Sequence, residues 1–404
     1  MAQLNQFTRM RRGFDQALSP IAFSWDPQPG QSLPSVVSFS RASTGTYISP
    51  TTGLVVTAAI DEPRITADGL LLEIAATNVI RRSEEISNAT WLKQGSGVAA
   101  PTVTADQGTA PDGNLTADRV QIQASSGNAS HYSFVEQSFT VGSTGRYSLS
   151  FWAKSFDGSS SYTTYMSFYT GTTWVNQQIT ITGTWQRFVF EDQNLTAATW
   201  LVAIGNARGM SGSGQNGQSA ADILLWGVQA ERQRAATSYI PTASGAAARG
   251  QDICSFPHGL TAADSNWSFA ADITPASPGT GWPSSNSNVF LIGSSYVAAD
   301  SAYLVVNGST QKLEFGVIDT AAAARSVPET QNQPNTKTRV FARAAQGVLS
   351  VNYQGSTSGS PSGAGTGLLT TVSPNLLLSD STAGVSLFGF IRNIVIARTA
   401  AGAQ

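Results

Sequence analysis

The chain has 404 residues, of which 41% are hydrophobic and only 12% are charged, about half the typical fraction of about 25%. Its formal net charge of −2 argues against nucleic acid as a partner, and its single cysteine, Cys254, excludes an intrachain disulfide. The two histidines, His131 and His258, lie far apart in the sequence. We therefore expect no metal ion and no cofactor.

The N-terminal segment carries a helical pattern. Its apolar residues are spaced by three or four positions, which places them on one stripe of a helix. They are Leu4, Phe7, Met10, Phe14 and Leu18. Ser19-Pro20 and the proline-rich stretch 26–30 then interrupt it. We predict that residues 1–30 form an anchoring helix and an extended segment, which attaches to a partner or to its own copies. The alternative is a helix packed on its own domain.

No apolar run approaches the about 20 residues that span a bilayer, so we expect no membrane insertion. The N-terminus also lacks the apolar core of a secretory signal.

From about residue 35 the pattern changes to short apolar pieces separated by Gly, Pro, Ser and Thr, which is typical of strands and turns. Residues 31–80 are predicted to be a β-hairpin-rich opening module, and residues 81–245 a jelly roll with aromatic strands. A small, polar stretch at 241–250 indicates a linker. Residues 246–404 form a second strand series. The predicted fold is all-β, with two tandem β-sandwich (jelly-roll-type) domains behind a short N-terminal helix.

The strands expected in the first domain are 117–123, 130–140, 147–154, 162–169, 177–182, 185–191, 199–204 and 222–229. Those expected in the second are 266–274, 289–292, 302–307, 312–319, 338–344, 348–353, 376–378 and 385–398.

Several spaced motifs occur in one order along residues 35–250. They include Phe39-Ser-Arg-Ala-Ser43, Asp61-Glu-Pro-Arg64, Leu71-Leu-Glu73, Tyr147-Ser-Leu-Ser-Phe-Trp-Ala-Lys154, Thr184-Trp-Gln-Arg187 and Thr237-Ser-Tyr-Ile-Pro-Thr242. This set resembles phage tail-fibre and head-fibre proteins with a carbohydrate-binding-module-like jelly roll. In the C-terminal part, Asn266-Trp-Ser-Phe and Phe390-Ile-Arg-Asn-Ile-Val-Ile396 resemble concanavalin A-like (laminin-G-type) sandwiches.

The resemblance implies a protein on the exterior of the virion, frequently a homotrimer, that attaches to capsid or tail proteins. It also implies adhesion to a host surface glycan.

Sugar sites on β-sandwiches combine aromatic rings, which stack on the C–H face of a pyranose, with amides that bond its hydroxyls. Aromatic residues beside turns or polar clusters are therefore the candidates. We select Trp174, Tyr162, Tyr165, His131, Tyr132, Asn176, Trp282 and Tyr296. For each, the alternative is an aromatic residue that caps the rim of a sandwich.

An enzymatic role is not expected. Glycoside hydrolysis needs two carboxylates about 5–10 Å apart. Glu191 and Asp192 are adjacent and so point to opposite faces of a strand, and no Glu-X-Asp-X-X-Glu pattern occurs. Two alternatives to the adhesin stay open. One is a structural capsid or tail decoration protein without glycan binding. The other is a depolymerase whose carboxylates are distant in sequence.

Overall fold

The computed structural model describes residues 21–398 apart from 126–129, 170–171, 173, 207–218, 262–263, 265, 276–286, 294–297, 308, 331–335, 354–359, 361, 364–368, 370–374 and 381–384. All regular structure in the described residues is β-strand, which confirms the all-β prediction. The same residues contain no helix long and apolar enough to cross a membrane. The stripe from Leu4 to Leu18, predicted to be a helix, lies outside the described residues.

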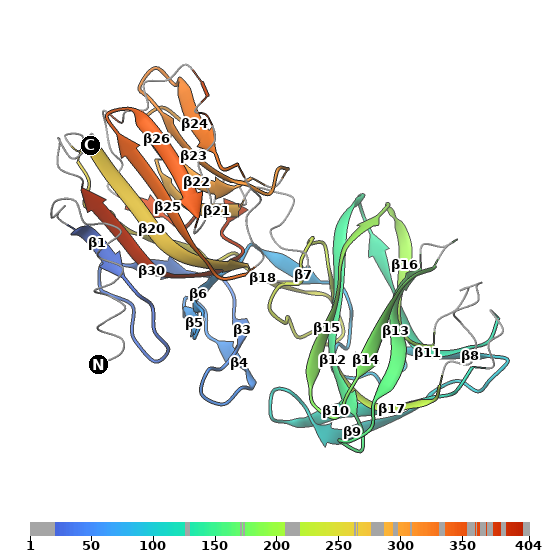
Figure 1. Ribbon diagram of the computed structural model, residues 1–404. Coiled ribbons are helices and arrows are strands. Elements are labelled where there is room, and N and C mark those ends of the chain that lie inside the picture. Colours follow the sequence, from blue (N-terminus) through green and yellow to red (C-terminus); the bar gives the residue numbers. More distant parts are fainter. Residues whose placement is uncertain are drawn as a thin grey trace.

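Two five-stranded antiparallel sheets face each other around the core of the jelly roll (Figure 1). The first sheet, in the order β15-β12-β17-β10-β9, contains β9 (Thr102–Thr109), β10 (Leu115–Ile122), β12 (Gly145–Ser155), β15 (Gln186–Leu195) and β17 (Ala221–Glu231). The second, in the order β14-β13-β16-β11-β8, contains β8 (Leu92–Ser96), β11 (Tyr132–Val141), β13 (Tyr162–Tyr169), β14 (Trp174–Ile181) and β16 (Ala198–Asn206). Every strand predicted in this part is present.

A second pair of sheets encloses another core. One has the order β26-β25-β20-β30-β6-β5, with β1 paired to β30. It contains β1 (Ile21–Trp25), β5 (Arg64–Thr66), β6 (Gly69–Leu72), β20 (Asn266–Pro275), β25 (Thr338–Ala345), β26 (Val348–Tyr353) and β30 (Gly389–Arg398). The other, β2-β19-β27-β21-β22-β23-β24, contains β2 (Ser38–Ser40), β19 (Ile253–Pro257), β21 (Ser287–Ile292), β22 (Ser301–Val306), β23 (Leu313–Ile318), β24 (Ala324–Pro328) and β27 (Asn375–Leu377).

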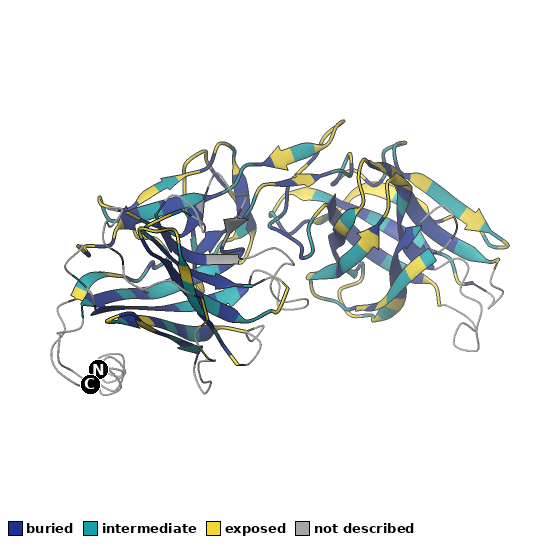
Figure 2. Ribbon diagram, turned by 90° about the horizontal axis from the view of Figure 1, so that it is seen from above, coloured by how far each residue is buried: buried dark blue, intermediate teal, exposed yellow. Residues whose placement is uncertain are grey.

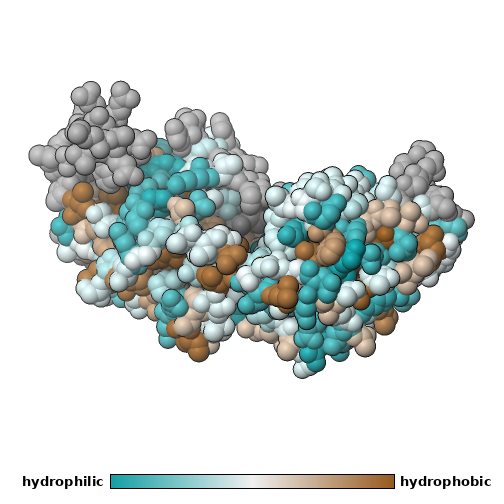
Figure 3. Space-filling view, turned by 90° about the horizontal axis from the view of Figure 1, so that it is seen from below, coloured by the Kyte–Doolittle hydropathy of each residue, from teal (hydrophilic) through white to brown (hydrophobic). Residues whose placement is uncertain are grey.

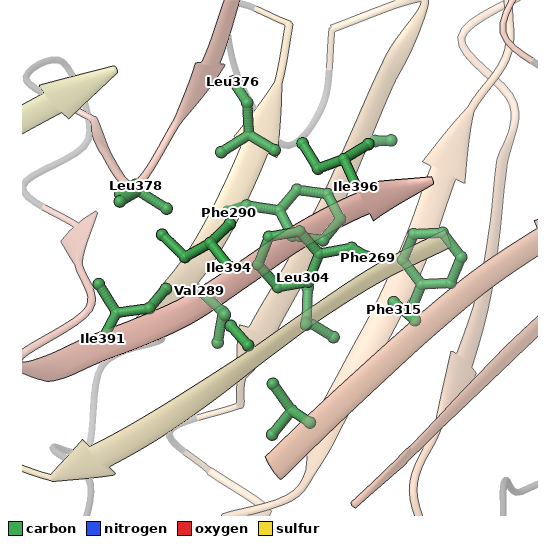
Figure 4. Close-up of a cluster of buried hydrophobic side chains, with 14 of the residues drawn as sticks. Phe269, Val289, Phe290, Leu304, Phe315, Leu376, Leu378, Ile391, Ile394 and Ile396 are labelled. Atoms are coloured by element: carbon green, nitrogen blue, oxygen red, sulfur yellow. The ribbon is translucent and has the colours of Figure 1, made fainter. Parts of the chain in front are cut away.

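The second core is aromatic and aliphatic. Figure 4 shows Phe269 of β20, Phe290 of β21 and Phe315 of β23 close together between the sheets. The rings of Phe269 and Phe290 have centroids 4.6 Å apart, and all three residues are at most 1% exposed. Figure 2 shows buried residues along the strands of both bodies, with exposed residues at turns and on the outer parts of several strands. Burial of this apolar surface is the main driving force for each body.

The strands within residues 31–80, expected to form a β-hairpin-rich module, are distributed over four sheets. Strands β2, β5 and β6 pair within the C-terminal sheets, while β3 (Gly45–Ile48) and β4 (Val55–Ala58) form a hairpin of their own. Strand β7 (Ala76–Asn78) pairs with β18 (Ala247–Arg249) between the bodies (Figure 1). A last short pair is β28 (Ser379–Asp380) with β29 (Val385–Ser386). Within residues 1–30, predicted to be an anchoring helix and an extended segment, residues 21–25 form β1.

A buried ionic cluster lies where the two bodies meet. Three guanidinium groups, those of Arg41, Arg64 and Arg249, face two carboxylates, those of Glu73 and Asp252, and every side chain is at most 1% exposed. Arg64 bonds Glu73 at 2.7 Å and also contacts Asp252. Arg41 bonds Asp252 at 3.1 Å, and Arg249 lies 3.5 Å from Glu73.

The chain segment that follows β17 completes this cluster. The backbone N–H and the hydroxyl of Ser238 each donate to Glu73 at 2.7 Å. Burial alone would raise the pKa of Glu73, but Arg249, Arg64 and these two bonds outweigh it and lower the pKa to about 2. The cluster therefore joins residues of β5, the end of β6, β18 and the jelly-roll chain.

Candidate functional site

The sheet β14-β13-β16-β11-β8 has one face in the jelly-roll core and one face outside it. Core side chains alternate along its strands, as with Val135 in β11, Met166 in β13 and Val202 in β16. Because successive side chains of a strand point to opposite faces, the intervening residues lie on the outer face. Several of those residues are aromatic.

A row of aromatic rings crosses this outer face. Tyr132 stacks on Phe134 with centroids 4.8 Å apart, and Phe134 lies 5.4 Å from Trp174. Trp174 in turn stacks on Tyr169 at 4.8 Å. Gly205 of β16 pairs with Tyr165 on one side and Phe134 on the other, so it brings no side chain between them. We call Tyr132, Phe134, Tyr165, Tyr169 and Trp174 the aromatic face.

Amide side chains lie beside the rings. Gln178 of β14 donates through Nε2 to the hydroxyl of Tyr165 at 3.3 Å. Asn176, two residues before it on the same strand, has a buried Oδ1 with no hydrogen-bond partner among the described residues. Gln94 of β8 donates to Glu136 at 3.1 Å. Amide groups next to aromatic rings can give a polar ligand both hydrogen bonds and apolar contact.

Four of the predicted site residues share this sheet face, namely Trp174, Tyr165, Tyr132 and Asn176. Trp174 is the first residue of β14 and is half-buried, whereas Tyr165 is only 6% exposed and Phe134, in the middle of the row, only 2%.

The other predicted residues lie elsewhere. Tyr162 packs against the jelly-roll core, so it is not part of the row. His131 precedes β11, and its ring occupies the space next to Gly97. Trp282 and Tyr296 lie outside the described residues.

Sequence reasoning missed Phe134, Tyr169 and Gln178 of the same face. The sequence did indicate them. Each of these residues lies two or four positions from a selected residue in the same strand, and residues at that spacing share a face of the sheet. The register of β13 with β16 and of β16 with β11, which places Phe134 beside Trp174, has no local signal.

The described residues contain no group of three or more His, Cys, Asp or Glu side chains that would hold a metal ion.

Neither a protein-family model nor a curated protein sequence matches this chain. Among solved structures, the mouse laminin alpha1 chain domains LG4-5 are 11% identical with a TM-score of 0.26, over 77% of this chain and 94% of that one. The tandem CBM22-1 and CBM22-2 domains of Paenibacillus barcinonensis Xyn10C are 12% identical with a TM-score of 0.27, over 81% and 98%. Truncated AlyQ, with CBM32 and alginate lyase domains, is 11% identical with a TM-score of 0.19, over 75% and 96%. All three TM-scores lie far below 0.5, so no ligand or role is carried over from these structures.

Proposed function

We propose that this protein binds carbohydrate without cleaving it, and that its binding surface is the aromatic face. The observation that carries the proposal is the row of contacting rings from Tyr132 to Tyr169, with the amides of Asn176 and Gln178 beside it. Exposed ring surface stacks on the C–H face of a pyranose, and amides pair with its hydroxyls. The rings support one another, so little side-chain freedom is lost on binding.

The absence of cleavage is part of the same proposal. Hydrolysis of a glycosidic bond needs two carboxylates about 5–10 Å apart. Among the described residues of the outer sheet face, Glu136 supplies a carboxylate, and Gln94 already bonds it. A second carboxylate is not found on that face in the described part of the chain.

We further propose that the glycan is a host surface polysaccharide and that the protein is a homotrimeric fibre or spike on the exterior of a phage particle. The support is the ordered set of motifs from Phe39 to Thr242. Attachment to capsid or tail proteins is assigned to residues 1–20, because Ile21 begins a strand of the C-terminal sandwich. Three weak sites on one particle protein would raise avidity. A decoration protein without glycan binding is the competing function.

Replacing Trp174 by alanine tests the binding surface. We expect W174A to weaken binding to host polysaccharide, measured on a glycan array and by titration, by about tenfold, which corresponds to about 1.4 kcal/mol of lost stacking. The matched control is W185A. Trp185 is also half-buried, but it lies beside the other sheet and bonds Thr109. Equal binding by W174A and the wild type, or an equal loss in W185A, would contradict the proposal.

Antibody labelling of the particles in electron micrographs, together with the mass of the purified protein in solution, tests location and oligomeric state. Label on the particle surface and a mass of three chains are expected. Unlabelled particles or a monomer would refute this part alone and leave glycan binding standing.

A further inference from the structure

A cavity of about 440 Å³ lies between the two bodies, apart from the aromatic face. Its walls come from the β3–β4 hairpin, the turn between β5 and β6, β12, β15 and the segment after β17. Four rings line it, those of Tyr47, Trp152, Tyr239 and Phe390. On the surface drawn in Figure 3, hydrophobic residues form small patches separated by hydrophilic ones. The cavity, which is partly open to solvent, gathers four aromatic rings in one place.

Arg187 of β15 brings a cation to this aromatic wall. Its guanidinium carbon lies 4.6 Å from the centroid of the Trp152 ring. Its Nη2 donates to the hydroxyl of Ser150 at 2.9 Å and to the backbone oxygen of Thr237 at 2.7 Å. Its Nε is buried and has no hydrogen-bond partner among the residues that the structure describes. Within the described part of the chain, no carboxylate lies within ion-pair distance of Arg187.

The acidic residues near Arg187 bond to other groups. Glu73 is held by Arg64 and Ser238, and Glu231 accepts bonds from Thr237 and Gln229. Burial lowers the pKa of Arg187, and the negative charges of Glu231, Glu73 and Glu191 oppose this effect from a distance. Arg187 is half-buried, and a partly desolvated cation with unused donors and no bonded counter-ion favours the approach of an anion.

The mouth of the cavity offers oxygen acceptors. Asp68, in the turn between β5 and β6, lines the cavity and is exposed, and so is its neighbour Ala67. Thr66 and Tyr47 also line it with hydroxyl groups. The cavity thus has a cationic group at one wall, aromatic rings along its sides and polar groups at its rim.

From this arrangement we propose that the cavity binds a carboxylate-bearing pyranose, such as a uronic acid unit of a polysaccharide. The carboxylate pairs with Arg187, the ring packs against Trp152 and Tyr239, and the hydroxyls meet Asp68 at the mouth. Because Nη2 already donates to Ser150 and Thr237, the carboxylate accepts from Nε or Nη1 of Arg187, in a charge-assisted bond that a neutral sugar does not provide. This site shares no residue with the aromatic face, so failure of one proposed binding site would leave the other proposal unaffected.

The test uses the full chain and three probes, namely methyl glucuronide, methyl glucoside and benzoate, followed by ligand-observed NMR and calorimetric titration. We expect methyl glucuronide to bind at least tenfold more tightly than either of the other two. In R187Q this binding falls at least tenfold. The matched control R119Q removes another half-buried arginine of the same sheet, which stacks on Phe156 and pairs with Asp222.

A second variant covers the case in which R187Q does not fold. In A67W a large ring at the exposed rim blocks the mouth without touching Arg187, and A67S is its control. Loss of glucuronide binding in A67W but not in A67S supports the proposal. Four results would overturn the proposal: glucoside binds as tightly as glucuronide, benzoate binds as tightly as glucuronide, folded R187Q keeps glucuronide binding, or glucuronide does not bind at all. Arg187 would then serve only to hold the Thr237 segment.

Discussion

At the scale of single residues, each charged group of the buried ionic cluster depends on the others for its hydrogen bonds and its counter-charge. Glu73 accepts bonds from Arg64 and from both the backbone and the hydroxyl of Ser238. A buried ion pair is not strongly stabilising compared with an apolar replacement, but removal of one partner leaves an unpaired charge in a medium that solvates it poorly. The cost of a single substitution should therefore be far larger at this cluster than at a surface pair.

The variant E73Q tests this difference. It removes one negative charge opposite three arginines, and we expect the free energy of unfolding to fall by about 3–5 kcal/mol. The control is E85Q, because Glu85 pairs with Arg82 at 3.0 Å on the surface. That pair should contribute about 0–1 kcal/mol. Urea unfolding measures the free energy of unfolding of both variants. A similar decrease in E73Q and E85Q would show that burial does not determine how much a lost charge destabilises the protein.

The pH dependence of this loss has a definite sign. Glu73 has a pKa of about 2 in the folded protein, below its ordinary value of 4.5, so ionisation of Glu73 favours folding above about pH 4.5. That contribution is lost as the pH falls from about 4.5 toward 2. The difference in unfolding free energy between wild type and E73Q should accordingly be largest near neutral pH and should narrow below about pH 4.5.

At the scale of elements, the alternation of apolar and polar residues and the positions of turn-forming residues were enough to predict most strands. The expected strand 162–169 coincides with β13, and 348–353 coincides with β26. Strand β9 was not predicted, because Thr102–Thr109 is mostly exposed and has little apolar alternation. Strand β1 was missed because its five residues adjoin a proline-rich stretch, and its pairing with β30 joins residues more than 350 positions apart.

The candidate sites were predictable to a smaller extent. Trp174 and Asn176 were predicted because they lie near each other in the sequence beside a turn, and β14 places them on the same sheet face. The cavity was not found, since Tyr47, Arg187 and Tyr239 come from three distant segments and each has an ordinary local context. Glu73 did carry a signal, because a carboxylate directly after the buried run Leu70–Leu72 requires a partner.

Because β1 is part of the C-terminal sandwich, an N-terminal truncation that extends past residue 20 also removes a strand of that sandwich. Phe23 stacks on Phe256 with centroids 4.1 Å apart, Trp25 is 9% exposed, and Asp26 pairs with Arg392 at 3.2 Å. Deletion of residues 1–30 would thus expose the edge of β30 as well as remove the proposed anchor. Deletion of residues 1–19 would leave β1 in place.

We expect the 1–30 deletion to melt at a clearly lower temperature than the 1–19 deletion and to aggregate more readily. Differential scanning fluorimetry and light scattering compare the two purified proteins directly. Equal melting temperatures would mean that β1 contributes little to the sandwich. Attachment to the particle should then be tested with the shorter deletion, since the longer one confounds attachment with folding.

At the scale of the whole molecule, the junction is built from charges and hydrogen bonds that neither body satisfies alone. Arg64 belongs to a strand of the C-terminal sandwich, whereas Ser238 belongs to the chain that leaves the jelly roll. Asn78 of β7, the strand that pairs with β18, donates to the backbone oxygens of Val228 and Ile240 and accepts from the backbone N–H groups of Ile80 and Ala230, and these bonds hold β7 on the jelly roll. Separation of the bodies would leave several of these buried groups unpaired, at about 1–3 kcal/mol each.

We therefore expect the two bodies to unfold together, in one calorimetric transition whose van't Hoff enthalpy equals the calorimetric enthalpy. The variant S238A removes a hydroxyl that accepts from Arg64 and donates to Glu73, both at 2.7 Å, without a change in charge. In S238A the transition should broaden or split, because the coupling between the bodies is weakened while each core is intact. S160A, at an exposed turn of the jelly roll, is the matched control and should keep the single transition. Two separate transitions in the wild type would mean that the cluster stabilises only the C-terminal sandwich, and the cavity would then be open to relative motion of its walls.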